Sequence, residues 1–125
     1  QNQMMQQQQI IKTLETKVAT DEETLVKETN KKESAIKSNE ELKSKLNQLN
    51  DELAVIENDS NLTANEKSKK SAKIKKEISA TQSKINLNSK KIEISTKKVE
   101  NLEKRIEASK KELEEKKKKE EEKKK

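Results

Sequence analysis

Seven residue types are absent from the 125-residue chain: glycine, proline, cysteine, histidine, phenylalanine, tyrosine and tryptophan. Without glycine and proline, little in the sequence interrupts a helix. Without aromatic side chains, nothing large fills a three-dimensional core or stacks on a nucleic-acid base. Without histidine and cysteine, the common groups of acid–base catalysis, nucleophilic catalysis and transition-metal binding are missing. We therefore expect no enzymatic activity, no catalytic residues, no cofactor and no metal site.

Apolar residues are also scarce, at 26% of the chain, whereas 43% of the residues are charged. This is too little apolar material for a compact globular domain of this length. Two classes remain: a disordered chain, or a long helical rod that needs only a narrow apolar seam. The longest apolar run is Leu53–Ile56, which predicts no transmembrane segment. The opening residues lack the features of a signal peptide, which is typical of a fragment or a processed chain.

Charge is distributed unevenly along the chain, whose net charge is +6. Residues 1–57 contain 8 lysines against 11 acidic residues, and residues 58–125 contain 22 basic against 13 acidic residues. The first part is therefore acidic, with a balance of −3, and the second is basic, with a balance of +9. Two such parts attract each other if the chain folds back on itself.

In the first part, two rows of positions recur every seven residues and are mostly aliphatic. The first row is Met4, Ile11, Val18, Leu25, Lys32, Asn39, Leu46 and Leu53. The second row is Gln7, Leu14, Asp21, Glu28, Ala35, Leu42, Leu49 and Ile56. This average spacing of 3.5 residues keeps one stripe facing a partner helix, as in a coiled coil. The pattern is strongest over 42–56 and weakest where Asp21, Glu28 and Lys32 interrupt it.

The second part repeats the seven-residue period with a shifted phase. Its aliphatic row is Ile78, Ile85, Ile92, Val99, Ile106 and Leu113, and its companion row is Ile74, Thr81, Asn88, Ser95, Leu102 and Ser109. Between the two parts, residues 58–61 are Asn, Asp, Ser and Asn, which compete with helix by bonding their own backbone. Thr63 and Glu66 have the spacing of a capping box. We expect a turn at 58–62 and a second helix from Thr63.

Folding the chain at this turn matches the two parts in antiparallel layers. If the residue numbers in each layer sum to 127, aliphatic positions meet aliphatic positions, and Asn39 lies opposite Asn88. The layers are Leu53/Ile74, Leu49/Ile78, Leu42/Ile85, Ala35/Ile92, Leu25/Leu102 and Leu14/Leu113. A matched polar pair inside an apolar seam fixes the register, because a slip would place each amide against an aliphatic side chain.

Flanking positions support this register less strongly, since it pairs Glu15 with Lys110 but also places Glu22 beside Glu103. Exposed ion pairs contribute only about 0–1 kcal/mol each, so the seam dominates. The alternative is one continuous helix with a four-residue stutter near residue 60, which assembles only with other chains. We favour the hairpin, an all-α, long antiparallel two-helix coiled coil with a charged helical C-terminal tail.

The predicted organisation is a Gln-rich N-terminal start (1–9), a first helix (4–57), a turn (58–62), a second helix (63–115) and a Lys/Glu tail or linker (116–125). In the tail, glutamates precede lysines by four residues, which supports a helix without a partner. Leu87 and Ile94 lie beside the second seam, where they either form a face for another helix or are isolated exposed aliphatic residues, the commoner case. A protein partner is expected for the module, and self-association is a further possibility.

A lysine cluster follows the turn and comprises Lys67, Lys69, Lys70, Lys73, Lys75 and Lys76. A helix distributes these residues around its circumference, and the chain has one arginine and no stacking residue. We therefore expect no specific nucleic-acid partner. The sequence favours a solubilising face, with weak, salt-sensitive binding to an anionic polymer or membrane surface as the alternative.

The opening segment resembles the coiled-coil region that precedes the catalytic domain in secreted Gram-positive cell-wall hydrolases of the PcsB type and their NlpC/P60-associated relatives. The residues concerned are Asn2, Gln3, Met4, Met5, Gln6, Gln7, Gln8, Lys12, Leu14, Glu15 and Lys17, and later Gln48, Glu52, Leu53, Thr63, Ala64, Glu66 and Lys67. The resemblance implies a secreted or cell-wall location, although a cytoplasmic one is also open. It further implies a non-catalytic module that positions or regulates an attached peptidoglycan hydrolase domain and contacts a membrane-bound division complex. The alternative is a structural or tethering coiled coil of unrelated origin.

Overall fold

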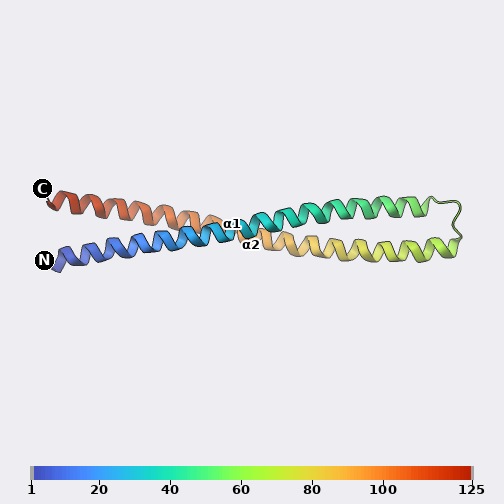
Figure 1. Cartoon of the computed structure of the whole chain (residues 1–125), viewed down its shortest axis with the longest axis horizontal. Coiled ribbons are helices and arrows are strands. Elements are labelled where there is room, and N and C mark those ends of the chain that lie inside the picture. The colour runs from blue at the N-terminus through green and yellow to red at the C-terminus, as the bar shows by residue number, and fades with distance from the viewer. Residues whose placement is uncertain (1, 125) are drawn as a thin grey trace. The chain divides into compact units, whose positions relative to one another are not determined.

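The computed structural model describes residues 2–124, which form two helices joined by a short turn. Helix α1 spans Asn2–Glu57 and helix α2 spans Ala64–Lys124 (Figure 1). The two helices pack against each other, and these residues contain no strand. The all-α helical hairpin is confirmed. The phase change near residue 60 marks a reversal of the chain and not a stutter within one continuous helix.

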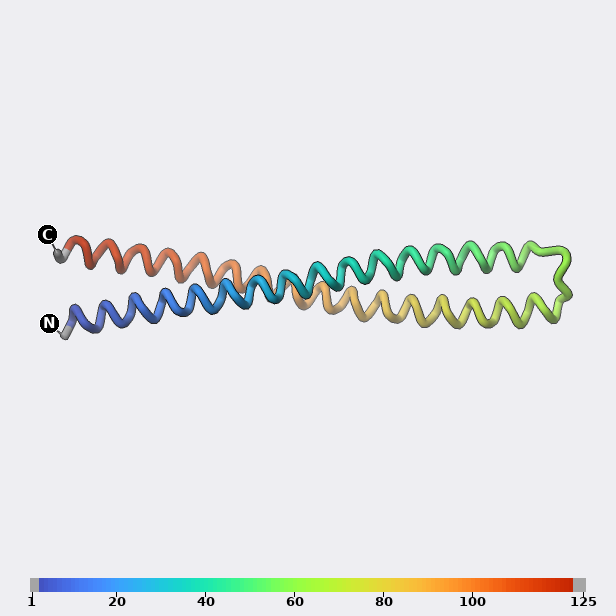
Figure 2. The backbone as a smooth tube through the Cα atoms, in the orientation of Figure 1, coloured from blue at the N-terminus to red at the C-terminus, as the bar shows by residue number. Residues whose placement is uncertain are grey.

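The described residues divide into two compact units. The terminal unit consists of 2–31 and 95–124, and the turn unit consists of 32–94. Within each unit, a segment of α1 lies beside a segment of α2 and runs in the opposite direction (Figure 2). Each unit therefore builds its own part of the seam between the helices.

The turn lies in the turn unit and is held by short-range hydrogen bonds. The backbone amide of Asn61 donates to Oδ1 of Asp59 at 2.9 Å, and the amide of Leu62 donates to the carbonyl of Asp59 at 3.4 Å. No described residue has a positive φ angle, so the reversal requires no glycine. The Asp59 side chain instead accepts a hydrogen bond from the Asn61 amide, which would otherwise be bonded to water.

Thr63 and Lys67 form hydrogen bonds with backbone groups at the helix ends beside the turn. Thr63 precedes α2, and its Oγ1 accepts the amide of Glu66 at 3.2 Å, while its carbonyl accepts the amide of Lys67 at 2.9 Å. This is the N-cap expected from the Thr63–Glu66 spacing. Lys67 Nζ donates to the carbonyl of Glu57 at 3.4 Å, which places a cation at the C-terminus of α1.

The helix ends differ from the ranges expected from the sequence. Helix α1 begins at Asn2, so the described part of the Gln-rich start is helical. Helix α2 continues past 115 to Lys124, so the helical C-terminal tail expected from the sequence is present and is continuous with α2. The four-residue Glu–Lys spacings of the tail favour helix without a packing partner. Gln1 and Lys125, assigned from sequence to the start and the tail, lie outside the described residues.

The seam follows the two heptad rows of each helix. On α1, every row position from Gln7 to Ile56 is buried or half-buried. On α2, the same holds for every row position from Ile74 to Leu113. Buried seam positions include polar side chains, and these are Asp21, Asn39, Thr81 and Ser109. The seven-residue spacing thus correctly identifies the packed face of both helices from Gln7 onward, whereas Met4, the first position of the predicted row, is exposed.

Two hydrogen bonds fix the register in the turn unit. Asn39 Nδ2 donates to Ser89 Oγ at 3.2 Å, and Asn88 Nδ2 donates to Ser38 Oγ at 3.1 Å. These two pairs lie on either side of the expected Asn39/Asn88 layer, so the register predicted from the sequence is confirmed there. Each amide thus bonds a serine of the opposite helix, a detail that the matched asparagines did not predict.

Candidate interaction surfaces

An ion pair crosses the seam of the terminal unit. Arg105 Nη2 donates to Asp21 Oδ1 at 3.0 Å. The Asp21 side chain is only 8% exposed because it occupies a seam position of α1, whereas Arg105 flanks the seam of α2 and is 57% exposed. A long arginine stem can cover apolar surface while its guanidinium reaches the carboxylate. This contact was missed from the sequence, where Asp21 was treated as an interruption of the seam.

Each unit retains one buried polar atom without a hydrogen-bond partner among the described residues. In the terminal unit this atom is Asp21 Oδ2, and in the turn unit it is Asn39 Oδ1. Leaving a buried acceptor unsatisfied costs about 1–3 kcal/mol. Both residues therefore weaken the seam relative to an aliphatic side chain. Asn39 offsets this cost by fixing the register through its bond to Ser89.

A second ion pair of the terminal unit lies at the surface. Lys110 Nζ is 3.3 Å from Glu22 Oε1, and the two side chains are 59% and 49% exposed. The sequence register paired Lys110 with Glu15 and placed Glu22 beside Glu103, and the structure corrects this. Lys110 instead reaches the glutamate one heptad further along α1, because flanking side chains extend along the helix axis as well as across the seam.

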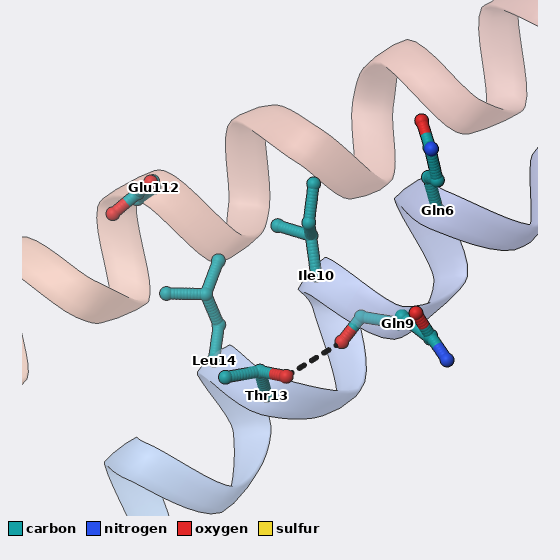
Figure 3. Close-up of a pocket in the computed structure, with 6 residues that line it drawn as sticks. All are labelled: Gln6, Gln9, Ile10, Thr13, Leu14 and Glu112. Carbon is teal, nitrogen blue, oxygen red and sulfur yellow. Dashed lines mark hydrogen bonds between the residues drawn. The ribbon is translucent and has the colours of Figure 1, made fainter. Parts of the chain in front are cut away.

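Near the ends of the two helices, the terminal unit contains an open groove, which Figure 3 shows. Its lining residues are Gln6, Gln9, Ile10, Thr13, Leu14 and Glu112. Ile10 and Leu14 point from α1 toward α2, and Glu112 comes from α2 (Figure 3). Thr13 Oγ1 donates to the carbonyl of Gln9 at 2.8 Å, so this hydroxyl is engaged by its own helix. The groove offers amide and aliphatic groups, which suit contact with another polypeptide.

Threonine hydroxyls elsewhere on the helices have the same arrangement. Thr16 and Thr24 on α1 donate to the carbonyls of Lys12 and Thr20 at 3.0 Å. Thr81 donates to the carbonyl of Glu77 at 2.8 Å and thereby satisfies its polar group inside the seam. Such bonds to the preceding turn are a common way for a helix to satisfy a hydroxyl group. These threonines are explained as structural residues.

The outer side of α2 in the turn unit carries exposed aliphatic residues. Leu87 and Ile94 are 61% and 56% exposed, as their positions beside the second seam predict. They are seven residues apart and therefore lie on one stripe of the helix. Lysines flank this stripe at the helix-neighbouring positions 84, 90 and 91, and all three are exposed. The surface thus combines an aliphatic centre with a basic border.

One member of the lysine cluster after the turn has a structural role. Lys67 is half-buried and bonds the carbonyl of Glu57, whereas the other five lysines are exposed. Lys67 therefore caps a helix instead of contributing to an outward basic surface. Within residues 2–124, no cluster of three or more histidine, cysteine or acidic residues has the arrangement of a metal site. In the same part of the chain, no helix is long and apolar enough to cross a membrane.

Comparison of the chain with protein-family models, with curated proteins and with solved structures finds no match. The interaction surfaces are therefore interpreted from their own chemistry. Two of them present aliphatic groups to solvent: the groove of the terminal unit and the Leu87–Ile94 stripe of the turn unit.

Proposed function

We propose that the chain is a non-catalytic helical module that sets a spacing and binds another polypeptide through the outer side of its helices. The observation that carries the proposal is the exposed Leu87–Ile94 stripe on α2. The heptad seam already pairs α1 with α2, so this stripe is not needed to close the hairpin. Exposed aliphatic residues in register on a helix favour contact with a second helix.

The side-chain inventory supports a binding role. The chain has no histidine and no cysteine, which are the usual general base and thiol nucleophile. Its buried polar residues are used within the seam, as the Asp21–Arg105 and Asn39–Ser89 contacts show. A helical hairpin with such a seam presents long, charged outer surfaces, and these are suited to holding and positioning a partner.

In vivo photo-cross-linking tests this proposal in the full protein in its native cells. A photoreactive residue replaces Leu87, and the matched control carries the same residue in place of Val55, which is also exposed at 69% but lies on α1. We expect a discrete covalent adduct from position 87 and a weaker one or none from position 55. Equal, diffuse labelling from both positions, or no adduct from position 87, would contradict a binding role for the stripe.

A more specific form of the proposal places the module in a secreted cell-wall hydrolase, where it positions or regulates the attached domain. Support for it comes from the sequence resemblance of the Gln-rich start and of the segment around the turn. The complete gene provides a direct test. A downstream domain with a catalytic cysteine and histidine, together with a secretion signal, is the expected finding, and a gene that lacks both would overturn this form while leaving the binding role intact.

A further inference from the structure

The Leu87–Ile94 stripe extends into a larger surface on α2, which we name the basic face. Its central row repeats every seven residues and consists of Ala80, Leu87 and Ile94. Lysines lie on both borders of the row, with Lys90 on one side and Lys84 and Lys91 on the other, while Glu77 lies beside Ala80. All of these residues belong to the turn unit and are exposed.

Helix α1 carries a surface of the opposite charge in the terminal unit, which we name the acidic face. Its central row is Ala19 and Val26, again seven residues apart, and Val26 is 60% exposed. Glu15 and Glu22 border the row on one side and Glu23 on the other, and Glu22 is also paired with Lys110 of α2. A shallow groove lies along this face and is lined by Thr16, Ala19, Thr20, Glu22, Glu23 and Val26.

The two faces match in spacing as well as in charge. Both have an aliphatic centre with a seven-residue repeat, which is the spacing that lets two helices pack along a common stripe. Because lysines lie on both borders of the basic face and glutamates on both borders of the acidic face, opposite charges meet whether the two helices run parallel or antiparallel. Favourable charge pairs at such flanking positions select the partner.

We propose that the basic face of one copy of this chain binds the acidic face of a second copy. This inference rests on the proposed binding role of the Leu87–Ile94 stripe and identifies the bound partner as a second copy of the chain. An aliphatic row of three residues is too narrow to bury much surface, so the contact belongs to the small, transient class of interfaces. Its charge pairs are exposed, so its strength falls as the ionic strength rises.

Sedimentation of the intact chain over a concentration series tests self-association at low and at high salt. We expect reversible association at low salt that weakens at high salt. The double variant Leu87→Gln/Ile94→Gln should weaken the association at least about tenfold and leave the helical circular-dichroism signal unchanged, because both side chains lie outside the seam. The control variant Val55→Gln replaces an exposed aliphatic residue that belongs to neither face. It should associate as the native chain does.

Charge reversal distinguishes this contact from nonspecific aggregation. The variant Glu15→Lys/Glu23→Lys makes the acidic face basic, and the variant Lys90→Glu/Lys91→Glu makes the basic face acidic. Each variant alone should lose association, because its two faces then carry the same sign. An equimolar mixture of the two variants should associate again, since every face finds an opposite one. Glu22 is left unchanged, so its ion pair with Lys110 is preserved.

Three results would overturn the second-copy contact: a monomer at every concentration, association that is unaffected by Leu87→Gln/Ile94→Gln, or a variant mixture that stays monomeric. The cross-linking experiment separates this failure from failure of the binding role. An adduct between two copies at position 87 supports both proposals. An adduct with a different protein supports the binding role and overturns the second-copy contact, and the lack of any specific adduct overturns both.

Discussion

The terminal unit and the turn unit close the same kind of seam with different polar contacts. The terminal unit uses a charged pair, Asp21 with Arg105, whereas the turn unit uses two neutral amide–hydroxyl bonds across the Asn39/Asn88 layer. A charged contact between a buried and an exposed group responds to salt, and a neutral bond responds much less. The two parts of one seam are therefore expected to differ in their sensitivity to solution conditions.

The units also differ in how completely their aliphatic residues are buried. Buried aliphatic residues of the terminal unit are Ile11, Leu14, Val18, Val99, Leu102 and Ile106, and those of the turn unit are Leu49, Ile74 and Ile85. The most regular aliphatic repeat in the sequence nevertheless lies in the turn unit, over 42–56. In the terminal unit, Arg105 and Lys110 reach acidic partners on α1, and long stems of this kind can cover apolar surface.

Truncation of a buried aliphatic residue in each unit has the largest expected effect. Ile106→Ala in the terminal unit and Leu49→Ala in the turn unit should each lower the free energy of unfolding by about 2–4 kcal/mol, because each creates a cavity in the seam. Hydrogen exchange should show the greater loss of protection in the unit that carries the change. Identical losses in both units would show that the hairpin opens as one cooperative element, and the comparison would then fail.

Removal of the charged partner in the terminal unit ranks second. Arg105→Met keeps an apolar stem but leaves the Asp21 carboxylate without its bond, which should cost about 1–3 kcal/mol. Ser89→Ala is the matched change in the turn unit and should cost about 0.5–1.5 kcal/mol. Urea unfolding at low and high salt provides the measurement. We expect added salt to reduce the cost of Arg105→Met but not that of Ser89→Ala, and equal salt responses would argue against two distinct kinds of contact.

Loss of the N-cap has a smaller effect that belongs to the turn unit alone. Thr63→Ala removes the acceptor of the Glu66 amide and should lower stability by about 1 kcal/mol. Thr63→Ser keeps the hydroxyl and serves as the control. Exchange of the amides at 64–67 should accelerate in the alanine variant, while amides of the terminal unit keep their native rates. Unchanged exchange at Glu66 would show that the cap contributes little.

The surface ion pair of the terminal unit is expected to matter least. Glu22→Gln removes the charge that faces Lys110, and both side chains are about half exposed. The free energy of unfolding should fall by about 0–1 kcal/mol at low salt and not at all at high salt. Urea titration at the two salt concentrations measures this. A larger effect that persists at high salt would place Glu22 among the structural contacts of the seam.

The hairpin, its packed faces and the register around Asn39 could be predicted from the sequence. The faces and the register depend on the seven-residue spacing, and the turn is indicated by Asp59, a residue type that favours turns, and by Thr63, one that favours helix N-caps. The sequence was not sufficient for the Asp21–Arg105 contact. Asp21 and Arg105 are nearly opposite each other in the predicted register, and this proximity was the only indication of the contact in the sequence. Recognising it requires knowing that an arginine outside the seam can reach a carboxylate within it, which depends on side-chain length and direction rather than on spacing.

The extent of α2 was also difficult to derive from the sequence. Glu–Lys pairs four residues apart contribute about 0.2–0.5 kcal/mol each, so the pattern alone leaves a helical tail and a frayed one close in free energy. The positions of Leu87 and Ile94 beside the seam were evident from the sequence, which left open whether the two residues form a face. The acidic surface around Val26 was not identified, because a single exposed valine gives little signal without the arrangement of its neighbours.

Arg105 has a practical consequence, since it is the sole arginine in the chain. An arginine-directed protease has a single target peptide bond, between Arg105 and Ile106, and Ile106 is 7% exposed in the native seam. Scission there requires the backbone to leave its helix, so the digestion rate measures transient opening at that one place. Local opening of the helix at this bond can thus be followed by proteolysis of the unmodified polypeptide, without a label.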